Sequence, residues 1–100
     1  LGERRALSKD GVVVVVLPTD RKTGQLAQHP TAMASGFMDA TETSQVFPGL
    51  TAAVAKILDE NRELAGQPDL MKQKVRQTAR DFLSKETGRR PTIIPMVLEV

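Results

Sequence analysis

The side chains that could carry out chemistry are few in this chain, and they stand apart from one another. The sequence has a single histidine, His29, and no cysteine. A catalytic zinc site needs several imidazoles or carboxylates together, whereas His29 stands beside Pro30 in a polar stretch that is typical of a turn. Ser35 and Ser44 have no second histidine or cysteine nearby that could activate them. We therefore expect no catalytic residue and no metal site in this chain.

A short segment, Ser35-Gly36-Phe37, places one glycine between a hydroxyl group and an aromatic ring. Phosphate-binding loops need several glycines at fixed spacing and a helix that starts directly after them. This segment has neither feature. We interpret it as a bulge in a strand.

Basic side chains offer another possible chemistry, the binding of RNA phosphates. Lys72, Arg76 and Arg80 are four residues apart, so on a helix they share one face. Arg89 and Arg90 follow, and a guanidinium group can bind a phosphate with two parallel hydrogen bonds. These five residues are the candidate RNA contacts. The alternative, which we favour, is a solvated helix face. Arg89 and Arg90 would then satisfy the last helix carbonyls or pair with Glu86, Asp81 or Glu99.

The composition gives RNA binding little support. The formal net charge is only +2, although the basic excess lies from Pro68 onward. The only aromatic rings are those of Phe37, Phe47 and Phe82, and proteins that bind single strands usually stack bases on exposed rings. We expect all three rings to lie mainly in the core.

Two stretches in the first half of the chain predict strands. Val12 to Leu17 is an apolar, β-branched run that Pro18 closes, which predicts a buried central strand. The polar stretch Thr19 to Pro30 predicts a hairpin-like connection, after which Thr31 to Met38 returns as a second strand.

Two helices are predicted next. Pro48 suits the first turn of a helix that Gly66 ends, and Pro68 likewise opens a second helix that Gly88 ends. A short connection makes them antiparallel neighbours. Their apolar stripes have helical spacing and consist of Leu50, Val54, Ile57 and Leu58 in the first helix and Met71, Val75, Ala79 and Phe82 in the second.

The last apolar stretch, Thr92 to Glu99, predicts a third strand. Pro95 has no backbone N–H to donate to a neighbouring strand, so this strand is expected at a sheet edge or with a bulge at Pro95. The predicted order is β-β-α-α-β, so we expect an α+β fold in which a three-stranded β-sheet packs against two α-helices. No linker or repeat interrupts this order, and residues 1–100 are expected to form a single domain.

Both faces of the predicted sheet are apolar, because successive side chains of a strand point to opposite faces. Two helices packed as a hairpin cover one face, so we expect a partner on the other, either another copy or another domain of the parent protein. The alternative is that the helices straddle the sheet, or that the N-terminal segment and the loop Thr19 to Pro30 fold over the second face. The candidate partner interface consists of Val13, Val15, Leu17, Ile94, Met96 and Leu98.

Two segments resemble the C-terminal domain of the ribonuclease J family, bacterial RNA-processing enzymes of the metallo-β-lactamase and β-CASP class. Glu3 to Gly11, the valine run after it and Asp20 to Gly24 resemble the start of that domain. Thr87 to Val100 resembles its last residues. Ser35 departs from the family pattern, in which an arginine commonly stands before the Gly-Phe pair, so any contact of that arginine is in doubt here.

The resemblance implies that the parent enzyme is a zinc-dependent 5′-to-3′ exoribonuclease and endoribonuclease in RNA processing and decay. Its zinc would belong to catalytic domains that are absent from this chain, and the chain itself is expected to need no cofactor. The chain is then a non-catalytic module for oligomerisation or interaction that supports the activity of the parent enzyme. The alternative function is an auxiliary RNA-binding module that steers substrate through the basic helix and Arg89-Arg90.

No stretch approaches the roughly 20 apolar residues of a membrane helix, and the first residues lack the order of a signal peptide. The absence of cysteine fits a reducing compartment. We expect a soluble, cytoplasmic protein that has no membrane contact.

Overall fold

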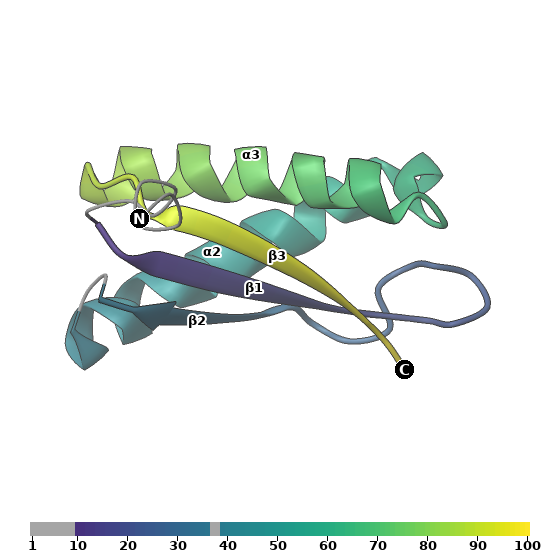
Figure 1. The fold of residues 1–100 in the computed structure, drawn as a ribbon, viewed down its shortest axis with the longest axis horizontal. Helices are drawn as coiled ribbons and strands as arrows, with labels where there is room; N and C mark the ends of the chain where they lie inside the picture. The colour runs from purple at the N-terminus through teal and green to yellow at the C-terminus, as the bar shows by residue number, and fades with distance from the viewer. Residues whose placement is uncertain (1–9, 37–38) are drawn as a thin grey trace, which may run out of the picture.

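The computed structural model describes residues 10–36 and 39–100, which form one three-stranded sheet and two long helices. Both helices pack on the same side of the sheet (Figure 1). This is the predicted α+β fold with the predicted order of elements. In chain order the elements are β1 (Val12–Thr19), β2 (Thr31–Ser35), α2 (Ala40–Glu60), the 3₁₀ helix η1 (Arg62–Leu64), α3 (Pro68–Thr87) and β3 (Thr92–Glu99).

The strand order is β2-β1-β3, so β1 is the central strand, as its valine run predicts. It pairs antiparallel with β2 and parallel with β3. Pro95 therefore lies in an edge strand, one of its two predicted settings, and the unbroken register from Thr92 to Glu99 shows no bulge there. Contrary to prediction, Pro18 does not close β1, because the strand continues through it to Thr19.

The core lies between the sheet and the two helices. On β1 the side chains alternate, so that Val13, Val15 and Leu17 are fully buried while the valines between them are half-buried. On β3, Ile93 and Pro95 are buried in the same phase, opposite Val13 and Val15. The helices contribute the remaining buried apolar side chains, which are Phe47, Leu50, Val54, Leu58, Met71, Val75, Ala79 and Leu83.

The helix α2 starts eight residues before the position predicted for it. The carboxylate of Asp39 accepts a hydrogen bond from the backbone N–H of Glu42 at 2.8 Å, which caps the helix at its first turn. Pro48 consequently lies inside the helix, where its missing N–H leaves one backbone bond unmade. The prediction that Asp39 to Gln45 forms a turn is wrong, because the cap outweighs the cost of the proline.

The C-terminal end of α2 also differs from prediction. The helix ends at Glu60, and η1 carries the chain to Gly66, whose φ is 81°. By contrast, α3 starts at Pro68 and ends at Gly88, which adopts the left-handed conformation with φ 72°, as predicted.

The buried stripe of α3 includes Leu83 rather than the predicted Phe82, which is only partly buried. The ring of Phe82 instead packs on α2 at Gly49, where an added Cβ would lie 2.8 Å from it. Phe47 is buried as expected, and Phe37 lies outside the described residues. The strand β2 ends at Ser35, before the predicted end at Met38, and Gly36 follows the strand end rather than forming a bulge within it.

Candidate interaction surface

The sheet face that the helices leave uncovered carries a group of exposed apolar side chains. Met33 is 53% exposed, Ile94 40%, Met96 49% and Leu98 51%. Val14 and Val16 lie between them, because the register places Val14 opposite both Met33 and Ile94. We call these six residues, Val14, Val16, Met33, Ile94, Met96 and Leu98, the open face.

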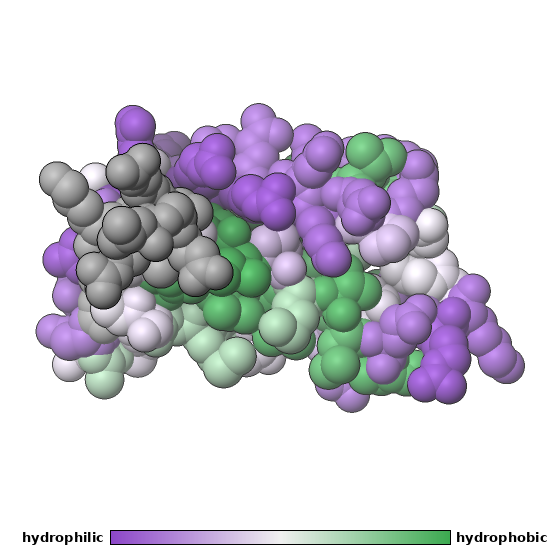
Figure 2. Space-filling model, viewed as in Figure 1, coloured by the Kyte–Doolittle hydropathy of each residue, from purple (hydrophilic) through white to green (hydrophobic). Residues whose placement is uncertain are grey.

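The open face is a continuous hydrophobic band that contains no charged side chain. It appears as the green surface across the middle of Figure 2, which has the same viewpoint as Figure 1. Its origin is the period-two alternation of the strands, since the β1 and β3 runs are apolar on both faces. Two large helices suffice to bury one face, and within the described residues no element packs on the other.

Half of the predicted partner interface lies on this surface. Ile94, Met96 and Leu98 are exposed, as a surface that binds a partner requires, and their binding role stays a prediction. Val13, Val15 and Leu17 are fully buried beneath the helices, so placing them on the uncovered face was wrong.

The physical reason is the register of the parallel pair. Val13 lies opposite Ile93, whereas Ile94 lies opposite Val14. Opposed residues share a face, so the predicted set joined two opposite phases. Sequence reasoning also missed Met33, which lies on the open side because the register places it opposite Val14.

A row of basic residues on α3 borders the open face. Lys72 and Arg76 are half-buried and Arg80 is exposed. At about 100° per residue, Arg76 lies about 120° around the helix from Phe82, which faces α2. The row is therefore on the side of α3 away from α2, consistent with the hydrophilic side chains that line the upper border of the green band in Figure 2.

These three cations have no acidic partner in the described part of the chain. In that part, ion pairs join Arg62 to Asp59 and Arg89 to Glu42. The predicted helical row is thus present as a positively charged surface that no carboxylate of residues 10–36 and 39–100 neutralises.

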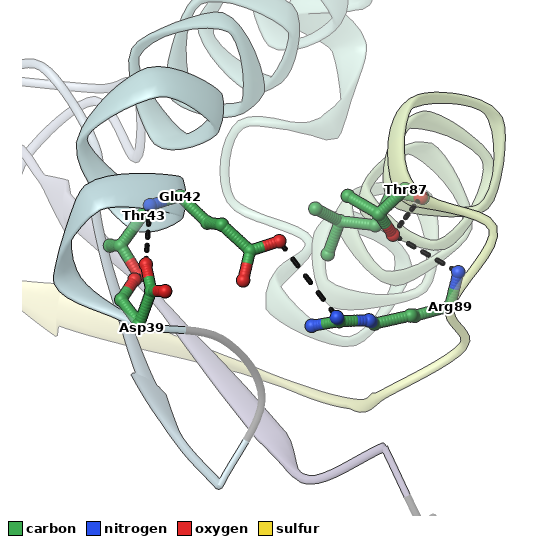
Figure 3. Close-up of polar contacts among 6 residues, drawn as sticks. Asp39, Glu42, Thr43, Thr87 and Arg89 are labelled. Atoms are coloured by element: carbon green, nitrogen blue, oxygen red, sulfur yellow. Dashed lines mark hydrogen bonds and ion pairs between the residues drawn. The ribbon is translucent and has the colours of Figure 1, made fainter.

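Arg89 and Arg90 are not part of that row, because local contacts hold the turn after α3. The Arg89 guanidinium lies 3.8 Å from the Glu42 carboxylate at the start of α2 (Figure 3). Its backbone N–H donates to the Thr87 hydroxyl at 3.0 Å. The Arg90 backbone N–H donates to the carboxylate of Asp10 at 2.7 Å. The carboxylates in these contacts belong to Glu42 and Asp10, which the favoured alternative did not name, and a role of this pair in RNA binding stays a prediction.

His29 lies in the connection before β2. Its Nε2 is 3.1 Å from the hydroxyl of Thr51, a buried residue of α2. Among residues 10–36 and 39–100, no three His, Asp or Glu side chains are grouped so that they could hold a metal ion. No helix within those residues has the length and apolar character needed to cross a membrane.

The connection between β1 and β2 is closed by its own polar groups. The backbone N–H groups of Thr23 and Lys22 donate to the Asp20 carboxylate at 2.9 and 2.8 Å. These two hydrogen bonds hold the pKa of Asp20 below its usual value. The loop lies against the chain that follows η1, since a Cβ added to Gly24 would be 2.4 Å from the backbone nitrogen of Gly66.

Comparison with known proteins identifies the family that this chain matches. The family model of the ribonuclease J C-terminal domain matches residues 1–100. Similar proteins include ribonuclease J2 of Bacillus subtilis (strain 168), which is 33% identical over 101 residues. The ribonucleases J 2 of Staphylococcus epidermidis and Staphylococcus aureus are 30% and 28% identical over the same length. All of this chain is covered in each comparison, but only 18% of each relative.

Proposed function

Since this chain belongs to the family of ribonuclease J C-terminal domains, we propose that it is a non-catalytic module that brings copies of a ribonuclease J together. The chain spans about a fifth of the length of its curated relatives. Zinc-dependent RNA cleavage in the cytoplasm would then be the work of catalytic domains outside this chain. The module would support that activity by assembly.

The observation that carries this proposal is the open face. Four of its side chains are 40–53% exposed, although they are as apolar as the residues of the core. Full burial of such a side chain contributes about 1.5–3 kcal/mol, so covering the exposed halves of four would contribute on the order of 3–6 kcal/mol per copy. Two copies together would offset much of the cost of association, which is about 4–15 kcal/mol.

A second copy is the partner that the chemistry of the open face favours. In a twofold dimer the same patch meets itself, so the patch as a whole must be complementary to itself. Uncharged apolar side chains meet this condition, whereas a patch of one charge would repel its copy. Two sheets can pack face to face at about 10 Å with interdigitated side chains.

The test is the absolute mass of the 100-residue chain by light scattering over a concentration series. We expect a dimer or larger species that persists at high salt, because apolar burial is not screened by ions. Met96→Glu should shift the chain to monomer. Leu70→Glu is the matched control, since Leu70 is similarly exposed at 47% but lies on α3. A wild-type monomer at every concentration would contradict the proposal, and the face would then dock on the catalytic domains.

RNA binding is the second candidate function, and the basic row favours it. Lys72, Arg76 and Arg80 lie about 6 Å apart along the helix axis, at 1.5 Å per residue, and no carboxylate of the described chain neutralises them. A backbone lying along α3 could contact all three. Each neutralised phosphate of a single strand lowers the slope of log K against log salt by about 0.7.

Fluorescence anisotropy with a single-stranded RNA oligomer tests this candidate. Replacing the three residues of the row by Gln should weaken binding and flatten the salt slope by about 2. The control replaces Arg21, Lys22 and Lys56 by Gln, which removes the same charge elsewhere. Equal losses in the two triple variants would mean that net charge, not the row, attracts the RNA.

A further inference from the structure

The outer edge of β2 is an unprotected strand edge. β2 lies at one side of the sheet and, among the residues that the structure describes, pairs only with β1, so alternate backbone N–H and C=O groups point outward. Its five residues, Thr31–Ser35, include neither a proline nor a charge, two of the devices that protect strand edges. The other edge strand, β3, has Pro95 at its middle and Glu99 at its end. The two edges therefore differ in their capacity to accept a further strand.

The sequence of β2 reads almost the same in both directions: Thr-Ala-Met-Ala-Ser. An antiparallel pair of two such strands, related by a twofold axis at Met33, would place each residue opposite one of the same or a similar type. Met33 would face Met33 of the second copy, and Ala32 would face Ala34. Thr31 would face Ser35, and pairs of hydroxyl residues across strands are favourable. A twofold axis pairs residue i with j and j with i, so this near-symmetric sequence places matched side chains opposite each other along the whole contact.

We propose that two copies pair through their β2 edges and so form one continuous, six-stranded sheet. The helices of both copies would then lie on the same side of that sheet. The inference rests on the proposed function, because both concern association between copies of the chain. The edge contact is made by backbone hydrogen bonds of β2, whereas the proposed function uses the apolar side chains of the open face. The edge contact would leave the open face uncovered and twice as wide.

The helix side of β2 has room for a second strand. An open groove of about 490 Å³ runs between β2 and α2, lined in part by Ala32, Thr43, Phe47 and Pro48. Ala34 of the second copy, which pairs with Ala32, would project over this groove. Alanine suits that place because α2 packs directly against β2. On the opposite side, Thr31, Met33 and Ser35 are exposed, so their pairing across the new contact meets no obstruction within the described residues.

Cysteine cross-linking tests the geometry, since the chain has no cysteine of its own. Residues directly opposite each other in an antiparallel pair have Cα atoms about 4.5–5.5 Å apart, within the range of disulfides. Met33→Cys should therefore oxidise to a covalent dimer as its main product. Met96→Cys is the control, because Met96 is equally exposed on the open face but lies in β3. It should remain mainly monomeric under the same oxidation.

A pair of charge variants then tests the proposed register between the two β2 strands. In Thr31→Lys/Ser35→Lys, like charges would oppose each other at both ends of the contact, whereas in Thr31→Lys/Ser35→Glu opposite charges would. We expect self-association of the first variant to be at least about tenfold weaker than that of the second, measured by analytical ultracentrifugation.

The outcomes separate this inference from the proposed function. A wild-type dimer that cross-links through Met96→Cys, with no difference between the two charge variants, would overturn edge pairing and leave face-to-face assembly standing. A wild-type monomer would overturn both. Cross-linking through Met33→Cys together with the charge difference would establish the edge contact, whatever covers the open face.

Discussion

The two faces of the sheet carry the same kinds of side chain in opposite environments. On the helix side, Val13, Val15 and Leu17 are completely buried. On the open side, Ile94, Met96 and Leu98 are 40–51% exposed. Burial is thus decided by where the two helices lie and not by residue type. No element of residues 10–36 and 39–100 packs on this apolar face, which makes it the candidate for contact with another molecule.

Neighbouring residues of β1 allow the sharpest test of this comparison. Val15→Asp would place an unpaired carboxylate under the helices, at a cost of several kcal/mol, against a typical domain stability of about 5–15 kcal/mol. We expect this variant to be unfolded or close to it at 25 °C. Val14→Asp, one residue away on the open face, should retain the fold. Circular dichroism during heating measures both, and equal unfolding temperatures would show that the faces do not differ.

Truncation of leucine on each face gives a smaller contrast. Leu17→Ala removes a fully buried side chain and should lower the free energy of unfolding by about 2–5 kcal/mol. Leu98→Ala removes a half-exposed one and should cost less than about 1 kcal/mol. Urea unfolding of dilute samples, in which assembly does not contribute, provides the comparison. A larger loss for Leu98→Ala would mean that the open face is part of the folded core.

The smallest effect is expected at Asp20, which lies on neither face. Hydrogen bonds from the backbone of Thr23 and Lys22 lower its pKa in the folded chain, so they stabilise the fold above the pKa of the unfolded state. This contribution is lost as the pH falls through the lower, folded value. Asp20→Asn should therefore lower the unfolding temperature slightly at pH 7, and the difference should vanish in acid. A difference that grows in acid would contradict this assignment.

Local patterns in the sequence predict most of the fold. The valine run predicts the central strand, and Pro68 and Gly88 predict the limits of α3. Pro95 predicts an edge strand or a bulge, and the structure has the first of these. Each of these signals acts within a few residues. The start of α2 could not be predicted in this way, because the Asp39 cap competes with the turn-like composition and with Pro48.

The candidate surface depends on information that no single segment contains. Alternation shows that Val13 and Val14 face opposite sides, but it does not show which side the helices cover. Only the parallel register, which pairs Val14 with Ile94, joins the two strands into one face. The row Lys72, Arg76 and Arg80 could be predicted because helical spacing alone determines it, whereas its position beside β3 depends on how α3 packs.

The methionines report directly on whether the open face becomes covered. Met33 and Met96 are on the open face, and Met71 is 4% exposed in the core. In a methyl-labelled sample with a soluble paramagnetic probe, we expect the Met96 signal to be broadened at low protein concentration and to become protected as the concentration rises, while Met71 stays protected throughout. A Met96 signal that remains equally accessible at all concentrations would contradict assembly through the open face.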